Sequence, residues 1–511
     1  MNKLKWAAVF RSFMGAVLPL VFLFAAGLLF GNLVHKHGLA GDIWWSWGFG
    51  RLDITHSTLD LFKNPNWNGR SLTGKPWVDT EWAWELFVAL VSPYANVALD
   101  AGFWWVMFIA TALLAPFIYF LTKQFFPKVT LIVFSALYLF PFSYLAVMEW
   151  DIRPQLVSLF MWGLLLLVLW KNNGKTWSRS MLWLLPLTLV WSAFHGDWLL
   201  SPALLLFDGA YEFVRSRFDW RFLLSRMSLL ISSIISVVLF NPFHYRGLSY
   251  AIWLTFDKNI NKNISEWMPI YAFRNTGNFY VVVITLALVF SLIALAYFVT
   301  RKFPNVKLFL WWLVTAFEAV MHIRMSLYLS IVSLLLLINV VYLFPSSGSS
   351  NIQKTASRAR RILPYILPGV IVSMGFLVYS HSPRQYATRY YFPAPIQWLK
   401  THAKSGLVLA PPYLGDELEV EGVKSVYVDG RADFFLLNDH RFQNYVSLIS
   451  HPNNVCGFLS HRPRISTFIW ANYINSTVPS LKVVKEHMAG CSSWPLVYEY
   501  KSRLYIWQRK H

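Results

Sequence analysis

Residues able to perform acid–base or phosphate-binding chemistry lie mostly between the apolar segments of this 511-residue chain. The first long polar stretch, 33–102, contains these carboxylates: Asp42, Asp53, Asp60, Asp79, Glu81, Glu85 and Asp100. Shorter breaks contain further polar residues: Glu149, Asp151, Arg153, Gln155, His195, Asp197, Asn241, His244, Arg246, Glu266, His322 and Arg324. Ionisable groups near membrane depth usually face a protein interior or a water-filled cavity. The set therefore predicts one shared cavity, against the alternative that these residues only cap helices and solvate loops.

Asp42 is the carboxylate with the clearest setting for catalysis. It is followed by an aromatic stretch that includes Trp44, Trp45 and Trp47. Partial burial beside such a stretch raises the pKa of a carboxyl group, which suits it to take a proton from an incoming hydroxyl. The alternative role is that of N-cap for a helix over the Trp-rich segment. The local sequence leaves both roles open.

Two arginines have a setting suited to phosphate. Arg153 precedes Pro154 at the start of an apolar run. Its planar donor fork matches a phosphate group, and the alternative is an ion pair with Asp151. Arg324 ends another apolar run beside His322, where it needs a partner. We expect that partner to be Glu318 or a lipid phosphate.

A short interfacial helix is predicted within the first polar stretch. Residues 76–82 lead into an apolar run, 83–91, that is too short to cross a bilayer. Asp79 is favoured as the N-cap of this helix. Glu81 or Glu85 could then face the cavity.

The elements that must position these groups are membrane-spanning helices. The chain is 56% hydrophobic and only 14% charged, whereas about a quarter of the residues in a globular protein are charged. Runs of the length that crosses a bilayer predict about eleven spans, near 13–32, 103–121, 129–148, 155–170, 181–194, 198–213, 223–240, 279–300, 308–322, 325–343 and 362–380. The first run follows a basic N-terminus and has no small-residue cleavage site, so we expect a retained helix and no cleaved signal peptide.

Charge fixes the orientation of these spans. Alternate loops are rich in basic residues, at 3–11, 123–128, 171–179, 215–226, 301–307 and 354–361. The positive-inside rule makes these loops and the N-terminus cytoplasmic, so the polar groups described above lie on the outer face. The net charge of +20 is explained by this topology, and nucleic-acid binding is not expected.

The tail, 381–511, has a different pattern and is predicted to be a small soluble α/β domain outside the membrane. Short apolar runs at 406–410 and 425–428 read as strands, the second followed by Asp429, Gly430 and Arg431. A turn stabilised by Asp429 and Arg431 is favoured over a binding crevice. The two cysteines of the chain, Cys456 and Cys491, both lie in this tail, and the sequence leaves open whether they form a disulfide. Residues 1–380 form the predicted transmembrane domain, with 33–102 as its long first outer loop.

Several short motifs together resemble the GT-C superfamily of membrane glycosyltransferases, in particular bacterial members related to the dolichyl-phosphate-mannose-dependent protein mannosyltransferases. They occur in order along most of the chain: 41–45, 76–82, Arg153-Pro154-Gln155, His195-Gly196, Asn241-Pro242, Glu266-Trp267 and Asp429-Gly430-Arg431. The resemblance implies a multi-pass protein of the bacterial cytoplasmic membrane.

The same resemblance implies an inverting transfer of a sugar from a polyprenyl-phosphate donor to a glycan, lipid or protein acceptor. Asp42 takes the place of the catalytic base. Substrate contacts fall to a group of polar residues: Arg153, Arg324, His195, His322, Glu81 and Glu266. The chain has no DxD motif, so neither a metal nor another cofactor is expected. The competing reading is a non-enzymatic flippase or transporter of lipid-linked glycans, although such proteins place polar groups near the bilayer midplane and often show repeated halves.

Overall fold

The computed structural model describes residues 42–56, 78–91, 154–274, 277–343, 393–423, 426–431, 435–436, 440–471 and 481–510. These residues are mostly helical, with one sheet near the C-terminus. The predicted spans at 13–32, 103–121, 129–148 and 362–380 lie outside the described residues. The count of eleven spans therefore stays a prediction.

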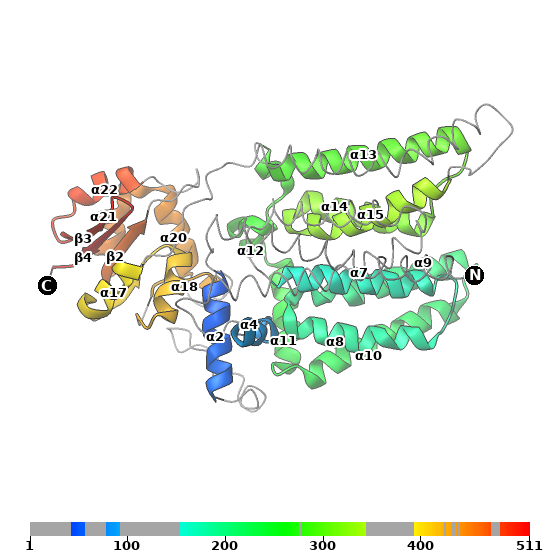
Figure 1. Ribbon diagram of the computed structural model, residues 1–511, viewed down its shortest axis with the longest axis horizontal. Helices are drawn as coiled ribbons and strands as arrows, with labels where there is room; N and C mark the ends of the chain where they lie inside the picture. The colour runs from blue at the N-terminus through cyan, green and yellow to red at the C-terminus, as the bar shows by residue number, and fades with distance from the viewer. Residues whose placement is uncertain are drawn as a thin grey trace, which may run out of the picture.

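A bundle of roughly aligned helices makes up one end of the molecule (Figure 1). Its helices are α7 (Gln155–Lys171), α8 (Leu184–Phe194), α9 (Leu200–Arg215), α10 (Trp220–Phe240), α13 (Gly277–Thr300), α14 (Val306–Met321) and α15 (Ser326–Leu343). Each matches an apolar run of the sequence to within a few residues. Their inner faces form one apolar core that includes Leu165, Trp191 and Trp312.

Two helices in the described part of the chain are long and apolar enough to cross a membrane, over Trp220–Phe240 and Val282–Thr300. Both keep large apolar side chains on the protein surface. In α10 these include Leu224, Ile231 and Leu239, and in α13 they include Phe290 and Phe298. Exposed apolar stripes of this kind mark surfaces that contact lipid or another protein, and the lengths suit a bilayer.

A buried ionic network ties the bundle together at the end away from the sheet. Lys307 of α14 pairs with Asp208 of α9, and its Nζ lies 2.9 Å from Oε1 of Glu212. Nε of Arg226 in α10 lies 2.8 Å from Oδ2 of Asp208. All four side chains are buried, so each charge is compensated inside the protein. Two of the cations assigned to basic loops, Arg226 and Lys307, therefore neutralise carboxylates within the bundle.

Shorter elements connect the bundle to the rest of the molecule. Helices α2 (Asp42–His56) and α4 (Trp82–Val91) pack against each other between the bundle and the C-terminal region (Figure 1). Helix α11 (His244–Phe256) and the short helix α12 (Lys258–Asn263) follow α10. The 3-10 turn Gly196–Leu199 joins α8 to α9, and the turn Ile323–Met325 joins α14 to α15. Two further 3-10 turns, Ser265–Trp267 and Ile270–Phe273, lie between α12 and α13, and Arg179–Trp183 precedes α8.

The C-terminal region contains a four-stranded sheet in the order β1-β2-β4-β3. Strand β1 (Leu407–Leu409) is parallel to β2 (Ile465–Ala471), while β4 (Leu504–Gln508) is antiparallel to both β2 and β3 (Leu496–Tyr500). The run 406–410 thus forms a strand as predicted. The run 425–428 contributes only a parallel bridge between Val426 and Val408.

Alternate residues of each strand point to opposite sides of the sheet, and helices pack on both sides. On one face, Ile469 and Ile506 pack with residues of α17 (Pro393–His402) and α18 (Pro412–Val420). On the other face, Phe468 and Trp507 pack with residues of α20 (Arg441–Ser450), α21 (Val455–Ser460) and α22 (Leu481–Ala489). A disulfide joins Cys456 to Cys491.

The second of these apolar layers extends beyond the tail. The cluster that contains Phe468 of the sheet also includes Trp45 and Phe49 of α2. It further includes Phe243, just before α11, and Tyr250 within α11. Helix α18 also packs directly against α2. The C-terminal region therefore shares its core with α2 and with the segment around α11.

Candidate functional site

A cavity of about 860 Å³ lies where the bundle helices meet α2, α11 and the C-terminal region. Side chains from both ends of the chain line it, from Trp45 and Ser46 to Gly430 and Arg431. It also contains most of the polar residues proposed from the sequence: Glu81, His195, Glu266, His322 and Arg324. The expectation of one shared cavity is met for these five residues, while their roles in binding stay predictions.

Arg324 lies at the centre of the polar part of this cavity. It belongs to the 3-10 turn between α14 and α15, where α14 ends at His322. Nη2 of Arg324 lies 3.3 Å from Oδ1 of Asp197, and Nη1 lies 3.7 Å from Oε2 of Glu266. Its guanidinium carbon also lies 5.3 Å from the centre of the Trp267 ring, a cation–π arrangement. Its carboxylate partners are therefore Asp197 and Glu266 in place of the expected Glu318.

His195 ends α8 and contacts groups from four elements. Nδ1 lies 2.9 Å from Oγ of Ser158 in α7 and 3.2 Å from Oδ2 of Asp197. Nε2 lies 3.4 Å from Oε1 of Glu81 and is in hydrogen-bond contact with Nη2 of Arg324. The side chain is 1% exposed, so these contacts define its environment.

Asp197 anchors the network in its ionised form. Burial opposes ionisation of this carboxyl, but Arg324 and His195 outweigh it and hold the pKa of Asp197 well below its usual range. The hydroxyl of Tyr328 also donates a hydrogen bond to Oδ2. Tyr328 follows Arg324 by four residues, about one helical turn, so both side chains reach the same carboxylate from successive turns.

Glu81 enters the cavity from the segment that begins α4. Its backbone N–H donates to Oδ1 of Asp79 at 2.7 Å. Asp79 therefore stabilises a turn just before α4, which begins at Trp82, and lies two residues ahead of the N-cap position predicted for it. Glu81 itself is partly exposed and lines the cavity. Glu85, one turn later, is buried instead, and burial together with the charges of Asp79 and Asp53 raises the pKa of its carboxyl. Of the two alternatives, Glu81 is the one that faces the cavity.

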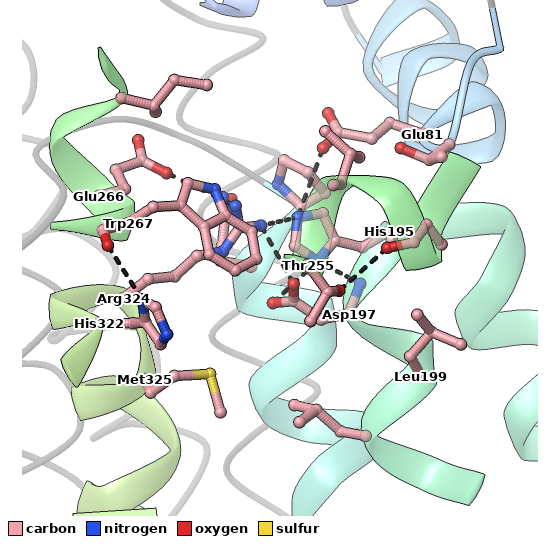
Figure 2. Close-up of a pocket in the computed structure, with 18 of the residues that line it drawn as sticks. Glu81, His195, Asp197, Leu199, Thr255, Glu266, Trp267, His322, Arg324 and Met325 are labelled. Carbon is pink, nitrogen blue, oxygen red and sulfur yellow. Dashed lines mark hydrogen bonds and ion pairs between the residues drawn. The ribbon is translucent and has the colours of Figure 1, made fainter. Parts of the chain in front are cut away.

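The other side of the cavity is formed by Glu266, Trp267 and His322. Nδ1 of His322 lies 2.9 Å from the carbonyl oxygen of Trp267, and the two rings meet edge to face at 5.8 Å. Figure 2 shows these residues opposite Glu81 and His195, with Arg324 reaching between the two groups. The site therefore has a guanidinium with carboxylates on both sides.

Apolar side chains line the remainder of the cavity. They come from α9, α11, α14 and the adjoining turns: Leu199, Leu200, Ala203, Ile252, Leu254, Phe256, Val314 and Met325. Ile252, Phe256 and Val314 are also 44%, 75% and 49% exposed on the outer surface. The apolar wall thus continues to the surface, and the cavity suits a ligand with a charged head and an apolar chain.

Two residues proposed from the sequence cannot be placed in the cavity. Arg153 lies outside the described residues. Asp42 is the first residue of α2, and its side chain lies outside the described part. Within the described ranges, no group of three or more His, Cys, Asp or Glu residues has an arrangement that could hold a metal ion.

Arg431 of the C-terminal region is a further cavity residue whose local role was anticipated. Its Nε lies 3.0 Å from Oδ1 of Asp429, and its Nη2 lies 3.0 Å from Oε2 of Glu419. The pair with Asp429 confirms the stabilised turn favoured from the sequence. Its guanidinium carbon also lies 4.8 Å from the ring centre of Phe49 in α2. Sequence patterns gave no sign of this contact, which joins two segments far apart in the chain.

Comparison with known proteins gives structural likeness only. Neither a protein-family model nor a curated protein matches the sequence. An oligosaccharyltransferase from Archaeoglobus fulgidus, solved with a tethered acceptor peptide containing the NVT sequon, has a TM-score of 0.49 and 12% identity over 90% of this chain and 70% of its own. The apo form of that enzyme has a TM-score of 0.45 and 12% identity, covering 89% and 69%.

Proposed function

We propose that this protein is a membrane glycosyltransferase that moves a sugar from a polyprenyl-phosphate donor to an acceptor at the outer face of the bacterial cytoplasmic membrane. The observation that carries the proposal is the composition of the cavity, in which the partly buried guanidinium of Arg324 lies at one end of an apolar wall that reaches the surface. A lipid phosphate combines the anion and the chain that these two parts fit.

The reaction needs a group at each end of the bond that changes. The acceptor hydroxyl attacks the anomeric carbon with inversion, and the bond to the phosphate breaks. Charge then develops on the leaving phosphate, where Arg324 is the group suited to stabilise it. Because the donor is a phosphodiester, the released polyprenyl phosphate carries one charge more than the donor did.

Asp42 remains our candidate for the base that takes the acceptor proton. Asp42 is the first residue of α2, and Trp45 and Ser46 follow it by three and four residues. Both of these line the cavity. Asp42 thus begins the helix whose next turn lines the cavity, which supports the assignment.

The position of the cavity supports an enzyme over a transporter. His195 ends α8, and His322 ends α14, so the polar groups lie where bundle helices terminate. A transporter is expected to bind its substrate midway through the membrane. The disulfide in the C-terminal region agrees with an extracytoplasmic location for that region.

The test is transfer by purified protein from a panel of radiolabelled polyprenyl-phosphate sugars to glycan, lipid and peptide acceptors. We expect Asp42→Asn and Arg324→Gln each to lower the rate by about 10²–10³-fold. Arg221→Gln is the matched control, because Arg221 is exposed at the start of α10 and does not line the cavity. Absence of transfer from every donor, or equal rates for all four proteins, would refute the proposal.

A further inference from the structure

The contact with Arg324 determines which tautomer neutral His195 adopts. A guanidinium can only donate hydrogen bonds, so Nε2 of His195, which contacts Nη2 of Arg324, must accept one. The ring proton of the neutral imidazole therefore resides on Nδ1. The backbone N–H of Asp197 lies 3.4 Å from Nδ1 and would require the opposite tautomer, but a proton on Nδ1 satisfies Ser158 and the carboxylate of Asp197 instead.

Nε2 has a second neighbour that does not suit this state. Oε1 of Glu81 lies 3.4 Å away, and an ionised carboxylate can only accept hydrogen bonds. Glu81 and Nε2 can therefore bond to each other only when a proton lies between them. Such a proton would make His195 an imidazolium held between Glu81 and Asp197, one carboxylate at each nitrogen.

A phosphate entering the cavity competes for Arg324. The guanidinium now pairs with Asp197 and Glu266 and caps His195. Phosphate binds the planar fork of an arginine with two parallel charge-assisted bonds. Moving Arg324 toward a phosphate uncovers Nε2 and leaves carboxylates facing the bound anion, which is unfavourable unless a further positive charge forms nearby.

We propose that binding of the lipid phosphate is coupled to uptake of one proton by His195 at Nε2. This inference rests on the proposed function and deepens it. The charged and titratable groups around His195 are Glu81 from the start of α4, Asp197 on the following turn, Arg324 from the α14–α15 turn, and Tyr328 of α15 through Asp197. Lys258, Glu318 and His322 line the same cavity farther along its wall.

The proton held by His195 is distinct from the one that transfer releases, which Asp42 takes in the proposed reaction. The acceptor hydroxyl loses its proton as the new bond to the sugar forms, and the polyprenyl phosphate leaves with an additional negative charge. An imidazolium at His195 offsets that charge beside Arg324. The carboxylates of the cavity repel the phosphate less when His195 is charged than when it is neutral. The lipid phosphate therefore stays bound until the proton leaves His195.

Isothermal titration calorimetry with farnesyl phosphate tests this directly. At pH 8 a phosphate monoester is a dianion, because its second pKa is about 6, and an ordinary histidine is neutral, because its pKa is about 6.5. Measuring the binding heat in two buffers of different ionisation enthalpy gives the number of protons taken up. We expect about one proton for the wild type, and a Kd that rises about tenfold per pH unit above pH 7.5.

The variants separate His195 from other sources of protons. His195→Gln should bind farnesyl phosphate with no proton uptake and with a Kd independent of pH. Glu81→Gln, at a partly exposed position, should reduce the uptake without the risk of misfolding that a buried substitution carries. His461→Gln should match the wild type, because His461 is exposed in the C-terminal region.

The ligand controls separate this inference from the proposed function. Farnesol lacks the phosphate and should cause no uptake, and inorganic phosphate should bind weakly if the lipid chain contributes. Failure of wild-type protein to bind farnesyl phosphate would refute the proposed function. Tight binding with the same proton count in wild type, His195→Gln and Glu81→Gln would leave the function intact and overturn the coupling.

Discussion

Gly50 of α2 lies directly against the backbone of Glu85 in α4, so that a Cβ built on Gly50 would overlap the carbonyl group of Glu85. The contact lets the two helices cross closely beside the cavity. Glycine is the residue that permits such an approach, although within a helix it costs about 1 kcal/mol relative to alanine.

Gly50→Ala should therefore destabilise the protein although alanine favours helices. Overpacking of this kind costs about 1–3 kcal/mol, which we expect to appear as a lower melting temperature in detergent. Gly247→Ala in α11 is the matched control, because a Cβ there meets its nearest neighbours at an ordinary 3.5 Å. Equal melting temperatures for the two variants would contradict the close crossing.

Glu85→Gln should change how stability depends on pH. Because burial raises the pKa of Glu85 above 4.5, the ordinary value for an exposed glutamate, the folded protein binds this proton more tightly than the unfolded chain does. The stabilisation is complete below pH 4.5 and is lost as pH rises through the folded pKa. Glutamine stays neutral, so the variant should melt above the wild type at pH 8, and this advantage should shrink as pH falls toward 5.

The control for this prediction is Glu486→Gln, whose side chain is 62% exposed on α22. Its melting temperature should follow that of the wild type at every pH. Parallel melting curves for Glu85→Gln and wild type across this range would show that Glu85 is ionised in the folded protein.

Lys307→Met should weaken the bundle through the carboxylates that it leaves behind. Asp208 and Glu212 would stay buried with less compensating charge, and breaking a buried pair in this way costs about 3–5 kcal/mol. The measurement is unfolding of the purified protein in mixed micelles. Lys302→Met, at an exposed position near the same end of the bundle, should have little effect.

A second substitution tests the cause of that loss. Adding Glu212→Gln to Lys307→Met removes one of the stranded carboxylates and should recover part of the stability. If the double variant is less stable than Lys307→Met alone, packing of the lysine chain against Tyr211 and Trp311 matters more than its charge.

Sequence patterns were most informative where a helix buries one face and exposes another to an apolar medium. The run at 155–170 became α7 and that at 325–343 became α15, each within a residue of its predicted ends. Helix α11 was not predicted, because the polar residues of His244–Phe256 interrupt its apolar pattern. Its buried face depends on Tyr250 and Ala251 contacting groups distant in sequence. Asp42–His56 likewise forms a helix that only the N-cap alternative had anticipated.

The site shows the same division. Glu81, His195 and Arg324 could be assigned to one surface because basic loops fix the opposite one. Their pairing could not be read from the sequence, since it depends on how the turn after α8 meets the turn after α14. Tyr328 was missed for this reason, although its position four residues after Arg324 places it on the adjoining helical turn.

The cavity wall joins Trp45, near the start of the chain, to Arg431, near its end, and the two segments share one apolar core. During synthesis α2 can pack against α4 early, but its contacts with α18 and with the sheet cluster form only after the last part of the protein has been translated. The cavity wall is therefore complete only when synthesis of the whole chain has finished.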